Sequence, residues 1–174
     1  LNYYAHNIEF CTFGAMMEGR KALALEYVDK LEQLTPDEAI ALYPEWMDGS
    51  CALRMHVYVR FGMWNEIVAQ PDYAGFRKAS RAIRRYARTV ALANLGRTKE
   101  ARRELAQFDS ALSKVPEDWV IAFNPATTVL GVARQIAEAL PLQDPLELTS
   151  AQQQLAGKEL QKMLTRRVCY HHSG

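Results

Sequence analysis

The sequence predicts an all-α protein built from antiparallel helix pairs, on three observations. Stretches with apolar residues at three- and four-residue spacings recur along the chain, which is the periodicity of an amphipathic helix. Three of these stretches are interrupted by Gly19, Gly62 and Gly96, and glycine readily adopts the conformations of a tight turn. The best candidate for a strand, residues 57–59, lies between segments of helical spacing.

Composition and charge narrow the class of protein further. A chain of 174 residues with 49% hydrophobic residues can bury a substantial core, which argues against disorder. The formal net charge is only +1, but residues 1–50 carry nine acidic and three basic side chains, and residues 72–103 carry ten basic and two acidic ones. This asymmetry indicates either an acidic partner or two halves that attract each other.

The N-terminal third predicts two long helices and one short one. Tyr3 to Met17 and Lys21 to Leu34 have helical apolar spacing. Thr35 and Pro36 then suit the N-cap and first turn of a short helix that stops near residue 43, and Thr35 with Glu38 has the spacing of a capping box.

A second pair of helices follows. Asp48 or Ser50 is the expected N-cap of a helix that runs to Phe61. After the glycine turn, the return helix over Trp64 to Ala69 is cut short by Pro71.

The third pair contains the longest predicted helix, Phe76 to Asn94, and its partner Lys99 to Leu112, with Thr98 as N-cap. Asn124 is the expected N-cap of one more helix that ends at Leu140. We interpret residues 1–140 as one helical domain and residues 141–174 as a C-terminal helix and tail packed on it. The tryptophans at 46, 64 and 119 are expected in the core or between helices.

The cysteines and motifs bear on compartment and chemistry. Cys11, Cys51 and Cys169 are odd in number and lack CxxC spacing, which favours a reducing, cytoplasmic compartment. His171 and His172 beside Cys169 lack a second ligand pair, so we interpret them as a frayed tail. We find no secretion signal, no membrane span and no catalytic or nucleotide-binding motif. We therefore expect no cofactor, no metal and no enzymatic activity.

The glycine turns carry a resemblance to a known family. The glycines at 62 and 96 lie 34 residues apart, and Ala24, Ile67 and Ala101 follow the three glycines by five positions. This pattern resembles the G-x-x-x-x-A core of tetratricopeptide repeats. Tyr-Tyr-x-His-Asn-x-x-Phe from residue 3, followed by Met17-Glu18-Gly19-Arg20, is similar to bacterial repeat proteins whose first helix opens with His-Asn.

The resemblance covers residues 3–140 and implies a right-handed superhelix of helix pairs, although the 43 residues between the first two glycines depart from the family's period. Thr12, Met55 and Thr89 stand where the family has small residues, and Arg88 stands where it has leucine. The chain therefore resembles a degenerate, truncated array.

The resemblance also implies a concave groove lined by the first helix of each pair. Positions carried over place these side chains in it: His6, Glu9, Phe13, Met17, His56, Arg60, Tyr86, Val90 and Asn94. Such a groove suits an extended peptide or a helix. The alternative is that these side chains pack against neighbouring helices, which the apolar spacing of Tyr86 and Val90 favours.

A row of arginines offers a second candidate site. Arg77, Arg81, Arg84 and Arg88 recur at helical spacing opposite the apolar face of their predicted helix. They form either a site for phosphates or an acidic peptide or a solvated face paired with the acidic first half, which we favour. Nucleic acid is not the expected partner, because the chain is not globally basic and lacks interleaved aromatic residues.

The expected function is a non-catalytic scaffold that binds a protein or peptide through the groove or through an open end of the array. Such an end can also pair two copies of the chain, because each repeat buries its apolar face only against its neighbours. Two alternatives stay open. One is polyanion or nucleic-acid binding through the arginine row, and the other is a small-molecule or metal-dependent enzyme in which His6, Glu9 and His56 converge.

Overall fold

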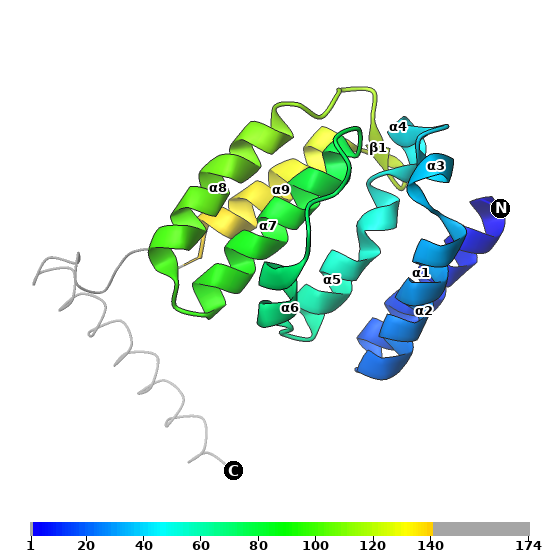
Figure 1. Cartoon of the computed structure of the whole chain (residues 1–174), viewed down its shortest axis with the longest axis horizontal. Coiled ribbons are helices and arrows are strands. Elements are labelled where there is room, and N and C mark those ends of the chain that lie inside the picture. The colour runs from blue at the N-terminus through cyan, green and yellow to red at the C-terminus, as the bar shows by residue number, and fades with distance from the viewer. Residues whose placement is uncertain (1, 141–174) are drawn as a thin grey trace, which may run out of the picture. The chain divides into compact units, whose positions relative to one another are not determined.

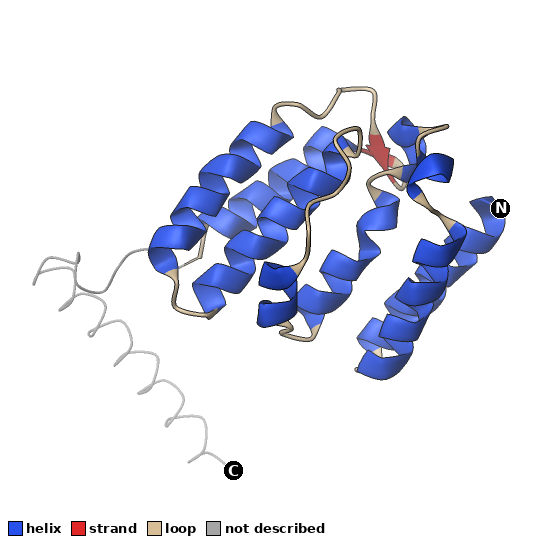
Figure 2. Ribbon diagram, in the orientation of Figure 1, coloured by secondary structure: helices blue, strands red, loops and turns tan. Residues whose placement is uncertain are grey.

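The computed structural model describes residues 2–140. This part of the chain is predominantly helical (Figures 1 and 2), which confirms the all-α class. Its elements are, in order, α1 (Asn2–Met17), α2 (Lys21–Leu34), α3 (Asp37–Ile40), α4 (Pro44–Met47), the 3₁₀ turn η1 (Ser50–Ala52), α5 (Leu53–Arg60), α6 (Trp64–Ala69), α7 (Lys78–Asn94), α8 (Thr98–Leu112), β1 (Val120–Ile121), β2 (Asn124–Pro125) and α9 (Ala126–Glu138). The predicted helix and tail after residue 140 lie outside the described residues.

The three glycine turns have the same geometry, which confirms them as turns. Gly19, Gly62 and Gly96 have φ of +73°, +65° and +73°, the left-handed conformation that glycine adopts at little cost. In each turn the N–H of the residue after glycine donates to a carbonyl oxygen five positions earlier, at 2.9 Å. The preceding helix ends two residues before the glycine and the next begins two residues after it. Three antiparallel pairs result: α1–α2, α5–α6 and α7–α8.

The residues five positions after these glycines lie in the core. Ala24, Ile67 and Ala101 are all fully buried, each on the return helix of its pair. Small or compact side chains there let the two helices approach closely. Pro71 lies two residues beyond the six-residue helix α6, as the predicted short return helix requires.

The helices follow one another in a row, with α7 at its centre (Figure 1). Helix α5 contacts the α1–α2 pair on one side and α7 on the other. Helix α9 lies against α7 and α8. The main core gathers around α7 and includes Met55, Phe108, Trp119 and Leu130, whereas smaller apolar clusters hold α2 against α1 and α5.

The predicted caps Thr35 and Thr98 are wrong. The Thr35 hydroxyl donates to the carbonyl oxygen of Leu31 at 2.7 Å, so it closes the end of α2 and does not cap α3. Thr98 is the first residue of α8 and not its N-cap. The N-cap residues are Pro36 and Arg97, and neither side chain makes a capping hydrogen bond.

The segment before α9 differs from the prediction as well. Asn124 does not cap α9; with Pro125 it forms a short strand paired antiparallel with Val120 and Ile121. The reversal passes through Ala122, which has φ of +54°. Two residues per strand are too few to show an alternating pattern in the sequence, so this hairpin was not predicted.

Two threonines fill the positions where close helix contact was expected. Thr12 and Thr89 are fully buried, and their hydroxyls donate to the carbonyl oxygens of Ile8 and Arg85 at 2.8 and 3.0 Å. Each hydroxyl is thereby satisfied within its own helix, so a polar side chain is tolerated in the interface.

Candidate functional site

Asp48 was predicted to cap the helix that follows it. It caps the first turn of α7 instead. Its carboxylate is fully buried, and Oδ2 accepts hydrogen bonds from the N–H groups of Ala79 and Ser80 at 2.8 and 3.2 Å. The Ser80 hydroxyl also contacts this carboxylate and donates to the Asp48 carbonyl oxygen at 2.8 Å. A helix N-terminus presents free N–H groups and a partial positive charge, so a buried carboxylate is well placed there.

Arg77, the first residue of the predicted arginine row, supplies the countercharge to Asp48. Its Nε donates to Asp48 Oδ1 at 3.0 Å and its Nη1 to Asp37 Oδ1 at 3.2 Å. The guanidinium also stacks over the Tyr73 ring, 4.5 Å from its centroid. Arg77 thus joins α7 to the acidic N-terminal part of the chain, and it is a structural residue.

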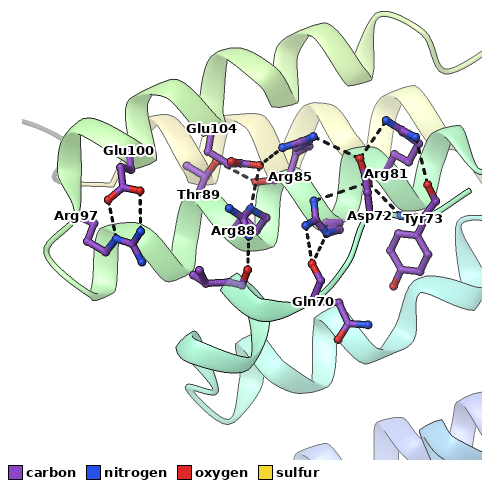
Figure 3. Close-up of polar contacts among 12 residues, drawn as sticks. Gln70, Asp72, Tyr73, Arg81, Arg85, Arg88, Thr89, Arg97, Glu100 and Glu104 are labelled. Atoms are coloured by element: carbon purple, nitrogen blue, oxygen red, sulfur yellow. Dashed lines mark hydrogen bonds and ion pairs between the residues drawn. The ribbon is translucent and has the colours of Figure 1, made fainter. Parts of the chain in front are cut away.

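The rest of the row meets the segment between α6 and α7 (Figure 3). Arg84 donates twice to the Gln70 carbonyl oxygen, at 3.1 and 2.6 Å. Arg81 Nη2 lies 3.0 Å from Asp72 Oδ2, and Arg88 donates to the Val68 carbonyl oxygen. The interpretation as a solvated face is wrong for Arg77 and Arg84, which are only 6% and 7% exposed. Guanidinium groups satisfy backbone carbonyls of a helix that Pro71 ends early.

Two carboxylates lie among the arginines beyond Arg77. Asp72 lies within 4 Å of guanidinium nitrogens of Arg81, Arg84 and Arg85. Glu104 of α8 contacts Arg85 at 2.8 Å and Arg88 at 3.3 Å. We call Arg81, Arg84, Arg85 and Arg88 with these two acids the arginine network. It holds four positive and two negative groups.

A second feature is the outer face of α1. Tyr3, His6, Phe10, Phe13 and Met17 follow one another at alternating three- and four-residue steps, so they share one side of the helix. All but the half-buried His6 are exposed. The opposite side of α1, with Ala5, Ile8, Thr12, Ala15 and Met16, is buried. Helix α1 is therefore apolar on two faces, and we call the exposed one the α1 seam.

The N-terminal end of the α1 seam opens into an aromatic recess of about 410 Å³. Its lining comes from α1, from the α4–η1 region and from the β1–β2 turn, and includes Tyr3, His6, Glu9, Trp46, Cys51 and Phe123. Trp46 and Phe123 are 62% and 86% exposed. The prediction that Trp46 lies in the core is therefore wrong. Trp64 and Trp119 do pack in the core.

Two of the predicted groove residues, His6 and Glu9, meet in this recess. His6 Nδ1 lies 3.5 Å from Glu9 Oε2, and the His6 ring packs edge-on against Phe10 with centroids 4.7 Å apart. Burial raises the pKa of the Glu9 carboxyl, against the opposing effect of His6. Cys51 lies in the same lining, and burial raises the pKa of its thiol to about 11.

The other predicted groove residues do not line the recess. Phe13 belongs to the α1 seam. His56 and Arg60 lie on α5 and are exposed. Tyr86 is half-buried and packs against Phe108, so for it the packing alternative holds. Asn94 is exposed and its amide donates to the carbonyl oxygen of Val90, within the same helix, at 2.9 Å.

The described residues offer little support to the metal-dependent alternative. No group of three His, Cys, Asp or Glu side chains is arranged to hold a metal ion in this part of the chain. In the same residues, no helix has the length and apolarity to cross a bilayer. His6 and Glu9 are not joined by His56 in the recess that they line.

The ion pairs that join α2 to α5 were also not predicted. Arg54 donates from Nε and Nη2 to both carboxylate oxygens of Glu32, at 2.7 and 2.6 Å, and from Nη2 to Asp29 at 2.7 Å. These two acids raise its pKa further above its ordinary value. Two acids spaced three residues apart on α2 were a usable signal, but their partner lies more than twenty residues away.

Comparison with models of protein families, with curated proteins and with solved structures finds no match to this chain.

Proposed function

We propose that residues 2–140 form a non-catalytic protein-binding module, and that the α1 seam accepts an amphipathic helix of a partner protein. The observation that carries this proposal is the row of four exposed apolar side chains, Tyr3, Phe10, Phe13 and Met17, on one side of α1. Alternating three- and four-residue spacing is the pattern with which one helix packs along another. A contiguous exposed apolar surface of this kind is typical of an interaction site.

Charge gives the partner helix a further property. Two acids, Glu9 and Glu18, lie on or directly after α1. A partner helix with lysines or arginines beside its apolar stripe is therefore favoured over one with acidic flanks. The exposed Trp46 and Phe123 extend the apolar surface beyond the N-terminal end of α1.

The relation to tetratricopeptide repeats remains part of the proposal. Three turns of the same geometry and three buried residues at the same position after glycine support it. In such an array each repeat buries its apolar face against its neighbours. We further propose a cytoplasmic location, for which the unpaired thiols of Cys11 and Cys51 are the supporting observation.

The test uses a designed helical peptide of about 20 residues with leucines at alternating three- and four-residue spacing and lysine flanks. Fluorescence anisotropy should show binding to the chain. A peptide of the same composition with the leucines spread around the helix should bind at least tenfold more weakly. A peptide with glutamate flanks should also bind more weakly.

Matched variants of the chain locate the contact. Phe13→Ser should reduce peptide binding by tenfold or more, whereas Val132→Ser on α9 should not, although the two side chains are 55% and 54% exposed. Equal binding by the two variants would refute the proposed site. Sedimentation of the chain without peptide tests whether a second copy of the chain occupies the α1 seam. A dimer that is lost in Phe13→Ser would assign the α1 seam to that second copy instead.

A further inference from the structure

The region between α7 and α8 contains a second recess that the proposed function does not use. It has a volume of about 690 Å³, within the range of small-molecule sites. Its polar lining consists of Lys78, Arg81 and Arg85 from α7, Gln107 and Ser110 from α8, and Lys114 just beyond α8. The other lining residues are a glycine and an alanine. Among the described residues that line the recess, none is acidic. We call this feature the basic recess.

Two of its cations belong to the arginine network, which is unbalanced. Arg81 and Arg85 share Asp72, at 3.0 and 3.4 Å, and Arg85 also contacts Glu104 (Figure 3). Since the network contains four guanidinium groups and two carboxylates, two positive charges lack a countercharge within it. Burial lowers the pKa of Arg84 in the same network, and the neighbouring Arg88 and Arg85 lower it further against the effect of Asp72. Such a partly buried surplus is a cost that a bound anion would offset.

The two lysines add to the surplus. Among the described residues, neither Lys78 nor Lys114 has an acidic side chain within ion-pair distance, and Lys78 Nζ lies 5.8 Å from the Trp119 ring centroid. Both lysines are exposed at the edge of the recess. Four cations therefore face one open volume, and the amide of Gln107 and the hydroxyl of Ser110 supply neutral hydrogen-bond donors.

We propose that the basic recess binds the phosphate chain of a small polyphosphate ligand. Arginine pairs with phosphate oxygens through two N–H groups, and lysine acts as a flexible point charge, so the set suits a compact anion of several charges. Within residues 2–140, the lining contains no aromatic side chain on which a base could stack. An inorganic triphosphate and a nucleoside triphosphate should therefore bind with similar affinity.

Isothermal titration calorimetry of the whole chain with sodium triphosphate tests this proposal. We expect one site, and a raised melting temperature in the presence of the ligand. The double variant Lys78→Gln/Lys114→Gln should bind about a hundredfold more weakly, at roughly tenfold for each charge-assisted contact. The charge-conserving Lys78→Arg/Lys114→Arg should retain binding. Lys21→Gln, an exposed lysine on α2, is the matched control and should bind like the unaltered chain.

Three results would overturn the proposal. One is the absence of binding, and the second is equal binding by the double variant and the control. The third is tight binding of a single-stranded oligonucleotide, with a steep dependence on salt, when triphosphate binds only weakly, because that assigns the surface to nucleic acid. Phe13→Ser should leave triphosphate binding unchanged, so this test and the peptide test fail separately.

Discussion

The Asp48 carboxylate is joined to Arg77 by a hydrogen bond of 3.0 Å from Nε to Oδ1, across 29 positions of sequence. Both residues are buried, and the same carboxylate caps the first turn of α7. Arg77, which also contacts Asp37 of α3, therefore joins the start of α7 to α3 and to the residue that follows α4. This contact explains how an irregular insertion between two glycine turns that lie 43 residues apart is held against a regular helix pair.

Removal of the Asp48 carboxylate should strongly destabilise the chain. Asp48→Ala leaves Arg77 and the N–H groups of α7 without partners, so we expect a loss of about 3–5 kcal/mol in the free energy of unfolding. Chemical denaturation monitored by circular dichroism measures it. In the double variant Asp48→Ala/Arg77→Met the unpaired charge is gone, so the loss should be smaller than the sum of the single losses. Additive losses would show that the pair is not coupled.

Substitution by alanine should lower the stability of the fold at Gly96 and raise it at Gly131. Gly96 has φ of +73°, where a Cβ is strained, so Gly96→Ala should cost about 1–2 kcal/mol. Gly131 lies inside α9. Apart from its chain neighbours and the backbone of its own helix, no atom of the described residues lies within 4 Å of the position that a Cβ would take, so Gly131→Ala should stabilise by about 0.5–1 kcal/mol. Thermal melts of both variants are sufficient. A gain in stability on Gly96→Ala would contradict the turn geometry.

The ionisation of Glu9 should lower stability as the pH rises. The folded protein raises the pKa of Glu9 by burial, so its protonated form is favoured in the fold. The free energy of unfolding should therefore fall as the pH rises from below about 4.5 through the folded pKa. Glu9→Gln should be more stable than the unaltered chain at pH 7, and this gain should vanish below about pH 4. A gain that does not vary with pH would exclude ionisation as its cause.

The two described cysteines should react at very different rates. Cys51 is buried with a pKa of about 11, whereas Cys11 is exposed. Because the thiolate is the reactive form, iodoacetamide at pH 8 should alkylate Cys11 and spare Cys51 in the native chain. Peptide mapping by mass spectrometry separates the two sites, with the denatured chain as the control for full labelling. Rapid native labelling of Cys51 would show that the aromatic recess opens.

Much of the fold follows from short-range patterns in the sequence. The turns at Gly19, Gly62 and Gly96 need φ above zero, and apolar residues at helical spacing surround each of them, so the pairs α1–α2, α5–α6 and α7–α8 were predictable. The early end of α6 follows from Pro71 in the same way. These features depend on interactions between residues at most five positions apart, which a single sequence displays directly.

The sites depend on contacts between distant residues, and there the sequence was a poorer guide. Asp48 has the chemistry of a cap, but only tertiary packing selects α7 as the helix that it caps. Arg84 has the charge of a surface residue, and only the path of the chain around Gln70 covers it. Apolar residues lie on two faces of α1, and their spacing does not indicate which face is buried. The packing of α2 and α5 against α1 decided this. The residues set what each side chain can bind, and the tertiary structure decided which partner lies within reach.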